Sequence, residues 1–233
     1  MAHTMNRRLF AAGLAGVSTA LAGSRWLAAA AADDYSATPT VPADQGLQRL
    51  LDGNKRFVGG NLTSLSNLVQ DREAVATGQS PFAVVVSCSD SRVPPEIVFD
   101  QTFGQLFVIR TAGQVIDEAA RGSIVYGVDY LKAPLLLVLG HSGCGAAEAA
   151  VAALQGATIP GYAYRFAEGI GPAVQSVLDQ PGDLVDNAVR ANITMAVEQL
   201  RTAEPDLAAA VRNGQLTVAG GYYDLASGEV TIL

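Results

Sequence analysis

Short apolar runs alternate with amphipathic stretches along this chain. Three runs of five or six mostly apolar residues have the length of buried strands, at 82–87, 106–110 and 135–139. Elsewhere the spacing of apolar residues predicts helices at 44–57, 68–77, 118–131, 146–154 and 183–202, and two more short strands at 216–221 and 229–233. This alternation predicts an α/β fold, with a mostly parallel central sheet of about four strands plus an edge strand, and helices on both faces.

Glycine and proline mark the ends of several predicted elements. Gly59 and Gly60 stop the first helix. Pro94 and Pro95 fit the first turn of a short helix, where a missing amide hydrogen costs nothing. The stretch 155–172 is rich in glycine, proline and aromatic residues, so we expect a loop there.

Residues 1–32 have the features of an export signal. We interpret residues 1–4 as a cloning remnant, and the pair Arg7 and Arg8 stands just ahead of a weakly hydrophobic stretch. Small residues at 28–32 offer a cleavage site, and the whole resembles a bacterial twin-arginine export signal. The alternative is an Ala-rich tail or an N-terminal helix. We expect an exported protein, in the periplasm, the cell envelope or the extracellular space of a bacterium.

The rest of the chain is predicted to form one domain. The polar, proline-bearing stretch 33–43 is interpreted as a linker, and 44–233 as a single domain without an internal repeat. No segment beyond the export signal reaches the roughly 18 uninterrupted apolar residues of a membrane span, so we expect no stable membrane anchor.

Composition adds two expectations about partners. The chain has 233 residues, of which 49% are hydrophobic, and a mean hydropathy of +0.25, which is high for a soluble monomer; we therefore expect apolar surface to be buried between subunits. The formal net charge is -7, and without residues 1–32 there are 12 basic against 22 acidic side chains. Such a surface repels phosphate groups, so neither nucleic acid nor an anionic membrane face is an expected partner.

Candidate chemistry follows two of the predicted strands directly. Cys88 comes after the run 82–87, and His141 and Cys144 come after the run 135–139. If these strands are parallel neighbours, their carboxyl ends meet in the crevice where open sheets bind ligands. Two thiolates and one imidazole suit zinc and leave a fourth tetrahedral position open, as a catalytic zinc site requires.

Asp90 and Arg92 lie in the same turn as Cys88. Asp90 can accept a hydrogen bond from a metal-bound hydroxide, or it can bind the metal itself in a closed form of the site. The planar guanidinium of Arg92 can hold the carboxylate away from the metal through two parallel hydrogen bonds. The alternative is a structural ion pair that caps the turn. The sequence leaves open whether the resting site is open or closed.

Other interpretations exist for the proposed metal ligands. Two cysteines in an exported protein often form a disulfide, and Cys88 and Cys144 are the only two cysteines in the chain. A protein exported through the twin-arginine route folds in the reducing cytoplasm first, so metal could occupy the thiolates before any oxidant does. His141 alone could be a core histidine, but its place three residues before Cys144, after a buried strand, favours a ligand.

The two motifs, Cys88-Ser89-Asp90-Ser91-Arg92 and the His141-to-Gly145 sequence His-Ser-Gly-Cys-Gly, resemble those of the β-class carbonic anhydrases. The likeness runs from the helix at 46–57 to Gly221-Tyr222-Tyr223. It implies zinc held by Cys88, His141 and Cys144, an Asp90–Arg92 pair beside it, and reversible hydration of carbon dioxide to bicarbonate and a proton. It also implies a homodimer or homotetramer.

In one bacterial subgroup of this family, a tryptophan, an arginine and a tyrosine frame a second, inhibitory bicarbonate pocket. Arg110 and Tyr223 match two of these positions, but Val85 takes the place of the tryptophan, and the only tryptophan of this chain is Trp26.

Two alternative functions would use the same residues. The first is a zinc hydrolase of a related small heterocumulene such as carbon disulfide, which would keep the ligands and differ in access to the pocket. The second is a non-catalytic zinc-binding or thiol-redox protein, which bonded cysteines would favour.

Overall fold

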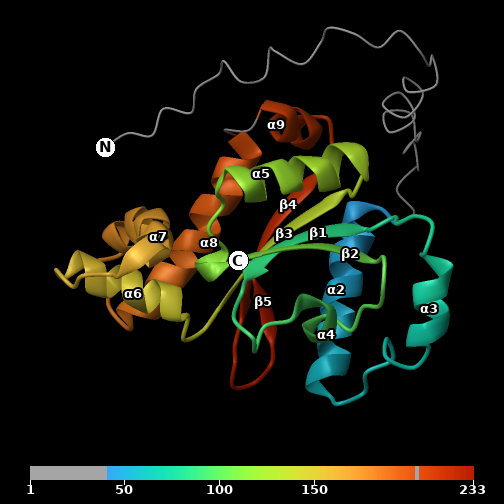
Figure 1. Ribbon diagram of the computed structural model, residues 1–233, viewed down its shortest axis with the longest axis horizontal. Coiled ribbons are helices and arrows are strands. Elements are labelled where there is room, and N and C mark those ends of the chain that lie inside the picture. The colour runs from blue at the N-terminus through green and yellow to red at the C-terminus, as the bar shows by residue number, and fades with distance from the viewer. Residues whose placement is uncertain (1–40, 203–204) are drawn as a thin grey trace, which may run out of the picture. The chain divides into compact units, whose positions relative to one another are not determined.

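A single five-stranded sheet organises the part of the chain that the computed structural model describes, residues 41–202 and 205–233 (Figure 1). The strands are β1 (Ala83–Cys88), β2 (Leu106–Thr111), β3 (Leu135–His141), β4 (Thr217–Tyr223) and β5 (Val230–Ile232). Their order is β2-β1-β3-β4-β5; the first four are parallel, and β5 pairs with β4 in the antiparallel sense at the edge. This confirms the predicted sheet. The predicted export signal and most of the predicted linker lie outside the described residues.

The two central strands carry the buried runs that the sequence predicted. Every residue of β1 and of β3 is buried. Residues of β1 alternate between the two faces, as the period of a strand requires: Val84 and Val86 pack in one core, Ala83 and Val85 in the other. Because β1 and β3 run parallel with Ser87 opposite Leu139, both strands end at the same edge of the sheet.

Helices cover both faces of this sheet, as predicted. On one side lie α2 (Ala43–Val58) and the short α4 (Pro95–Val98); on the other lie α5 (Glu118–Val125), α8 (Leu184–Thr202) and α9 (Pro205–Arg212) (Figure 1). The remaining helices are α3 (Leu68–Ala74), α6 (Gly145–Leu154) and α7 (Tyr164–Ser176), with short helical turns η2 (Ala112–Gln114), η3 (Tyr126–Tyr130) and η4 (Gly161–Ala163). None of the described helices combines the length and apolar character that crossing a membrane requires.

The helix predicted at 118–131 changes its hydrogen-bond pattern midway. After α5 the chain continues as the π-helical turn η3, in which the amide of Leu131 donates to the carbonyl of Tyr126, five residues earlier. Gly127 lies in this turn, where an added Cβ would come within 2.6 Å of Val84. The wider turn therefore sits where the helix approaches β1 too closely for a side chain.

The loop predicted at 155–172 is wrong for its second half. The turn η4 and the helix α7 occupy 161–176, with Pro172 inside α7. Pro172 lacks the amide that would bond the carbonyl of Glu168, but the apolar face of α7, formed by Ala167, Ile170, Ala173 and Val174, is buried in the core. Tertiary packing thus outweighs the local cost of the proline. The helix α9 was not predicted at all.

Candidate metal centre

The structure brings together the two cysteines and the histidine that the sequence analysis proposed as ligands. Cys88 is the last residue of β1, His141 is the last residue of β3, and Cys144 is the residue just before α6. Their Sγ and ring nitrogen atoms all lie within 4.8 Å of one another. All three side chains are buried, with exposed fractions of 5%, 0% and 2%. They form the one such cluster among the described residues.

Two glycines of the second motif make its tight geometry possible. Gly140 precedes His141, and an added Cβ at Gly140 would come within 2.7 Å of Ile193 on α8. Gly143, between His141 and Cys144, has a φ of 57°, in the left-handed region that favours glycine. The chain can therefore leave β3, turn sharply and place Cys144 back over the histidine.

The donor atoms of this cluster fit a metal ion. The Nδ1 atom of His141 lies 2.9 Å from the carbonyl oxygen of Ser142, and its Nε2 atom is buried without a hydrogen-bond partner. Both cysteines are free thiols, so the disulfide alternative does not describe this structure. An unpartnered buried nitrogen beside two sulfur atoms is costly in a protein interior unless a cation satisfies it. Soft sulfur and borderline nitrogen donors are those that zinc prefers.

The electrostatics of the cluster favour one thiolate before any metal binds. A hydrogen bond from the Cys144 thiol lowers the pKa of Cys88, and so does one from the amide of Gly113, which lies 3.3 Å from Cys88 Sγ. The same thiolate beside it, together with burial, raises the pKa of Cys144. Burial favours the neutral ring of His141, but the neighbouring Cys88 thiolate and the Ser142 carbonyl outweigh this and raise its pKa. Because a cation stabilises thiolates and neutral imidazole, metal binding would release protons from this site.

Asp90 and Arg92 form a close pair beside the cluster. The Nε atom of Arg92 donates to Asp90 Oδ1 at 2.9 Å, its Nη2 atom donates to Oδ2 at 2.6 Å, and its backbone amide donates to Oδ1 at 2.9 Å. The hydrogen bonds from Arg92 hold the pKa of the Asp90 carboxyl well below its usual range. Asp90 Oδ2 lies 3.9 Å from the Nε2 atom of His141. In this structure the carboxylate is held by Arg92, which is the open arrangement considered in the sequence analysis.

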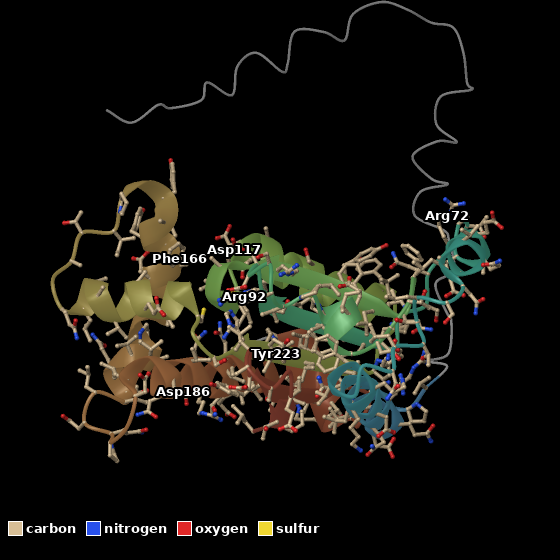
Figure 2. The ribbon with its side chains drawn as sticks, turned by 90° about the horizontal axis from the view of Figure 1, so that it is seen from below. Arg72, Arg92, Asp117, Phe166, Asp186 and Tyr223 are labelled. Atoms are coloured by element: carbon tan, nitrogen blue, oxygen red, sulfur yellow. The ribbon has the colours of Figure 1, made fainter. Side chains whose placement is uncertain are left out.

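Arg92 also reaches the second motif. Its Nη2 atom lies 3.4 Å from the carbonyl oxygen of Gly143. In Figure 2 the labelled Arg92 lies between α6 and the strands, in agreement with this contact. Arg92 thus bridges the turn after β1 and the turn after β3.

Arg110 has a role at the site that the sequence analysis missed. Its Nε atom donates to the carbonyl of Cys88 at 3.0 Å, and its Nη2 atom donates to the carbonyl of Asp90 at 2.5 Å. The guanidinium thus holds the turn that carries Cys88 and Asp90. Of the other two positions compared with the inhibitory bicarbonate pocket, Val85 packs in the core that contains α2, and Tyr223 is buried in that same core. No sequence signal marks this role, because Arg110 acts on backbone carbonyls; it becomes visible once the structure places Arg110 opposite Ser87.

Comparisons with known proteins agree with this geometry. The model of the family described as carbonic anhydrase matches residues 83–230. Carbonic anhydrase 2 of Mycobacterium tuberculosis is 40% identical over 184 residues, covering 78% of this chain and 89% of that protein. The carbonic anhydrase of Mycolicibacterium smegmatis is 40% identical over 186 residues, with the same coverage of both chains.

Solved structures give the same result for the fold. The structure of the β-carbonic anhydrase CcaA matches with a TM-score of 0.65 at 30% identity, covering 80% of this chain and 86% of that one. A Coccomyxa β-carbonic anhydrase matches with a TM-score of 0.64 at 28% identity, covering 80% and 86%. The matched region contains Cys88, Asp90, Arg92, His141 and Cys144. This chain therefore belongs to the carbonic anhydrase family, in its β class.

Proposed function

We propose that this protein catalyses the reversible hydration of carbon dioxide to bicarbonate and a proton, with zinc held by Cys88, His141 and Cys144. The observation that carries the proposal is the buried cluster of two thiols and an imidazole whose Nε2 atom lacks a partner. Such a donor set leaves one tetrahedral position for a water molecule. When bound there, zinc supplies Lewis-acid activation of that water near neutral pH.

Asp90 is proposed to orient the attacking water. Each carboxylate oxygen can accept more than one hydrogen bond, so Oδ2 can accept from a water molecule while it keeps its bond to Arg92. The low pKa of Asp90 keeps it ionised, so it acts as an acceptor and does not donate a proton. Fixing the water in this way directs a lone pair of its oxygen at the carbon of carbon dioxide; as the new C–O bond forms, one O–H bond of the water is broken and its proton is released to the solvent.

Arg92 is proposed to keep Asp90 in this role. A carboxylate released close to a cation would bind it directly and take the position of the water. Arg92 prevents this through two parallel side-chain hydrogen bonds and one from its backbone amide. The pair therefore works as a positioning device and not only as a turn cap.

One paired measurement tests the function. The purified protein should contain one zinc per chain by elemental analysis, and it should accelerate carbon dioxide hydration in a stopped-flow assay with a pH indicator. Cys144→Ser should lose both the zinc and the activity, because a serine hydroxyl is a much poorer zinc ligand than a thiolate. Zinc-loaded protein without hydration activity would contradict the proposed reaction, and full zinc retention in Cys144→Ser would contradict the ligand set.

We also propose that residues 1–32 direct export through the twin-arginine route. The support is the paired arginines followed by a weakly hydrophobic stretch and small residues. The test is cell fractionation of a bacterium that expresses the full chain. Replacing Arg7 and Arg8 by lysine should retain the protein in the cytoplasm, whereas an unchanged distribution would contradict export by this route.

Members of this protein's class form oligomers, and we propose that the β2 edge of the sheet contributes to a subunit interface. β2 is an edge strand, and an aromatic cluster of Phe107, Tyr126 and Tyr130 lies beside it, with ring centroids 5.5–5.8 Å apart. Tyr126 and Tyr130 are exposed, although both are large and mostly apolar. Analytical ultracentrifugation should show the wild type as a dimer or tetramer, and Tyr130→Glu should dissociate it. A wild type that sediments as a monomer would contradict the proposal.

A further inference from the structure

The orientation of the His141 ring depends on one backbone carbonyl. The Nδ1 atom lies 2.9 Å from the Ser142 carbonyl oxygen, and a carbonyl can only accept a hydrogen bond. Nδ1 must therefore carry the proton, which leaves the lone pair of Nε2 free on the side of Cys88 and Cys144. The direction of this lone pair is set by the position of the Ser142 carbonyl, because the ring pivots on that bond.

Ser142 is itself fixed by the end of β4 and the turn that follows it. Its backbone amide donates to the carbonyl of Tyr223 at 2.9 Å. Its side-chain Oγ accepts a hydrogen bond from the amide of Leu225, also at 2.9 Å. The labelled Tyr223 in Figure 2 marks where this end of β4 lies. These two contacts, one to the backbone amide and one to the hydroxyl, both tie Ser142 to the segment 223–225 and so fix where its carbonyl points.

The turn that holds Ser142 is rigidly built. The Asp224 carboxylate accepts from the amides of Ala226 and Ser227, at 3.1 and 2.7 Å. The amide of Asp224 donates to the carbonyl of Glu229 at 2.9 Å. These contacts close the turn between β4 and β5 on itself, so the Leu225 amide is presented in one direction.

Asn54 on α2 connects this turn to α2 and to the end of α4 through hydrogen bonds. Its Nδ2 atom donates to the carbonyl of Gly228 at 2.8 Å and to that of Val98 at 3.2 Å, and its Oδ1 atom accepts from the amide of Val230 at 2.9 Å. Asn54 is buried on α2. A continuous set of hydrogen bonds therefore runs from α2 through the β4–β5 turn to the residue that orients the histidine.

We propose that Ser142 is a positioning residue of the metal centre: its hydroxyl, held by the Leu225 amide, fixes the carbonyl that sets the tautomer and direction of the His141 ring. The inference rests on the proposed zinc site. Any residue except proline at position 142 would keep the backbone bond to Tyr223. The bond to Leu225, in contrast, depends on the hydroxyl of the side chain. Ser142→Ala would also leave the partly buried Leu225 amide without its acceptor.

The first measurement is the zinc dissociation constant, from competition with a chromophoric chelator at fixed pH. Removing a group that orients a metal-bound histidine typically weakens metal affinity about 10-fold to 100-fold, and we expect this for Ser142→Ala. Ser142→Thr keeps the hydroxyl and should remain within about threefold of the wild type. Ser87→Ala is the matched control: Ser87 also neighbours a proposed ligand and is fully buried, but its hydroxyl has no partner. It should likewise remain within about threefold.

A second measurement separates positioning from general destabilisation. Nitrogen NMR of the metal-free protein, selectively labelled in histidine, reports which ring nitrogen of His141 is protonated. The wild type should show the proton on Nδ1, and Ser142→Ala should show a mixture of both tautomers while circular dichroism shows the same fold. If Ser142→Ala does not fold, Ser142→Thr and Ser142→Gly are compared in the same way.

The outcomes distinguish this inference from the proposed function. If the wild type binds zinc but Ser142→Ala binds it within threefold as tightly, with an unchanged His141 tautomer, the positioning role is overturned and the zinc site stands. If the wild type binds no zinc, the metal site itself is overturned, and this inference with it.

Discussion

Asp100 is a buried carboxylate that ties α2 and the loop after it to the end of α4. Its side chain is fully buried, and it accepts hydrogen bonds from the side chain of Arg56, from the amide and hydroxyl of Thr63, and from the amide of Ser64. Burial alone would raise the pKa of this carboxyl. The hydrogen bonds from Arg56, Ser64 and Thr63 outweigh burial and hold its pKa well below the usual range.

We expect Asp100→Asn to lower the free energy of unfolding by about 2 kcal/mol at pH 7. The amides of Thr63 and Ser64 lie 2.9 and 2.8 Å from Oδ1, and an amide oxygen in its place can keep both bonds. The NH2 group would take the place of Oδ2, which now accepts from Arg56 Nε at 2.5 Å, so two donors would face each other. A hydrogen bond to a charged group contributes about 1.5–3 kcal/mol, and we take the lower part of that range because the Arg56 side chain is 36% exposed and water screens it.

The pH dependence gives the same reasoning a second test. The pKa of Asp100 is lower in the folded protein than in the unfolded chain, where it is about 3.9. Its contribution to stability is therefore fully present above that value and is lost as the pH falls toward the folded pKa. Asparagine does not titrate. The difference in stability between the wild type and Asp100→Asn should thus be constant from about pH 7 to 5 and shrink below about pH 4.

Urea unfolding followed by circular dichroism, at several pH values from 7 down to 3, measures both effects. Asp52→Asn is the matched control, because Asp52 is exposed on the same helix as Arg56 and pairs with Lys55 at 3.0 Å. It should move the unfolding midpoint far less than Asp100→Asn does. A loss below about 1 kcal/mol for Asp100→Asn, or a difference that stays constant down to pH 3, would refute the argument.

Two further predictions concern the site and the core behind it. Arg92→Ala should keep its zinc by elemental analysis but lose most of its hydration activity, because the freed Asp90 would bind the metal; Arg92→Lys should recover only part of the rate, since an ammonium cannot make two parallel hydrogen bonds. Near-wild-type rates in zinc-loaded Arg92→Ala would show that the pair is structural. Burial and the hydrogen bond to Asp186 raise the pKa of Tyr222 to about 12. The protonated hydroxyl of Tyr222 therefore stabilises the fold below about pH 10, and this contribution is lost between about pH 10 and 12. Tyr222→Phe should have a lower free energy of unfolding than the wild type at pH 8, and this difference should narrow from pH 10 upward in urea titrations.

The sheet could be predicted because its two central strands, β1 and β3, correspond to apolar runs with the length of a strand. Every residue of β1 and β3 is buried, and apart from Ser87 and His141 near their carboxyl ends these strands contain no polar position that would interrupt the apolar pattern. The meeting of Cys88 with His141 and Cys144 then follows from the rule that parallel neighbours end at one edge of the sheet. That prediction rested on the assumption that the two strands are parallel neighbours, which the structure confirms.

The helix α7 could not be predicted because its local sequence argues against it. Pro172 and two glycines lie inside it, and each lowers helix propensity. What stabilises α7 is contact with residues far away in the chain: an added Cβ at Gly169 would come within 2.8 Å of Val115, so this glycine allows the helix to approach the segment after β2. Information of this kind lies in the packing and leaves no periodic signal in a single sequence.

The roles of Arg110 and Ser142 escaped prediction for a related reason. Each acts through a backbone group of another segment: Arg110 on the carbonyls of Cys88 and Asp90, and Ser142 through the amide of Leu225. Backbone groups are the same in every residue, so the sequence does not mark which of them a side chain will meet.

Differences in burial explain why the three proposed ligands and the Asp90–Arg92 pair should respond differently to mutation. The three proposed ligands are almost completely buried, whereas the side chain of Arg92 is 58% exposed and that of Asp90 is 16% exposed. A change at Cys88, His141 or Cys144 removes a donor from the interior, where neither water nor another side chain can replace it, so metal binding and stability should fall together. A change at Arg92 leaves that interior intact and alters only where the Asp90 carboxylate points. Substitutions in the Asp90–Arg92 pair should therefore lower activity without lowering metal content, whereas substitutions of the three ligands should lower both. This contrast distinguishes residues that position groups beside a metal centre from the ligands of the centre itself.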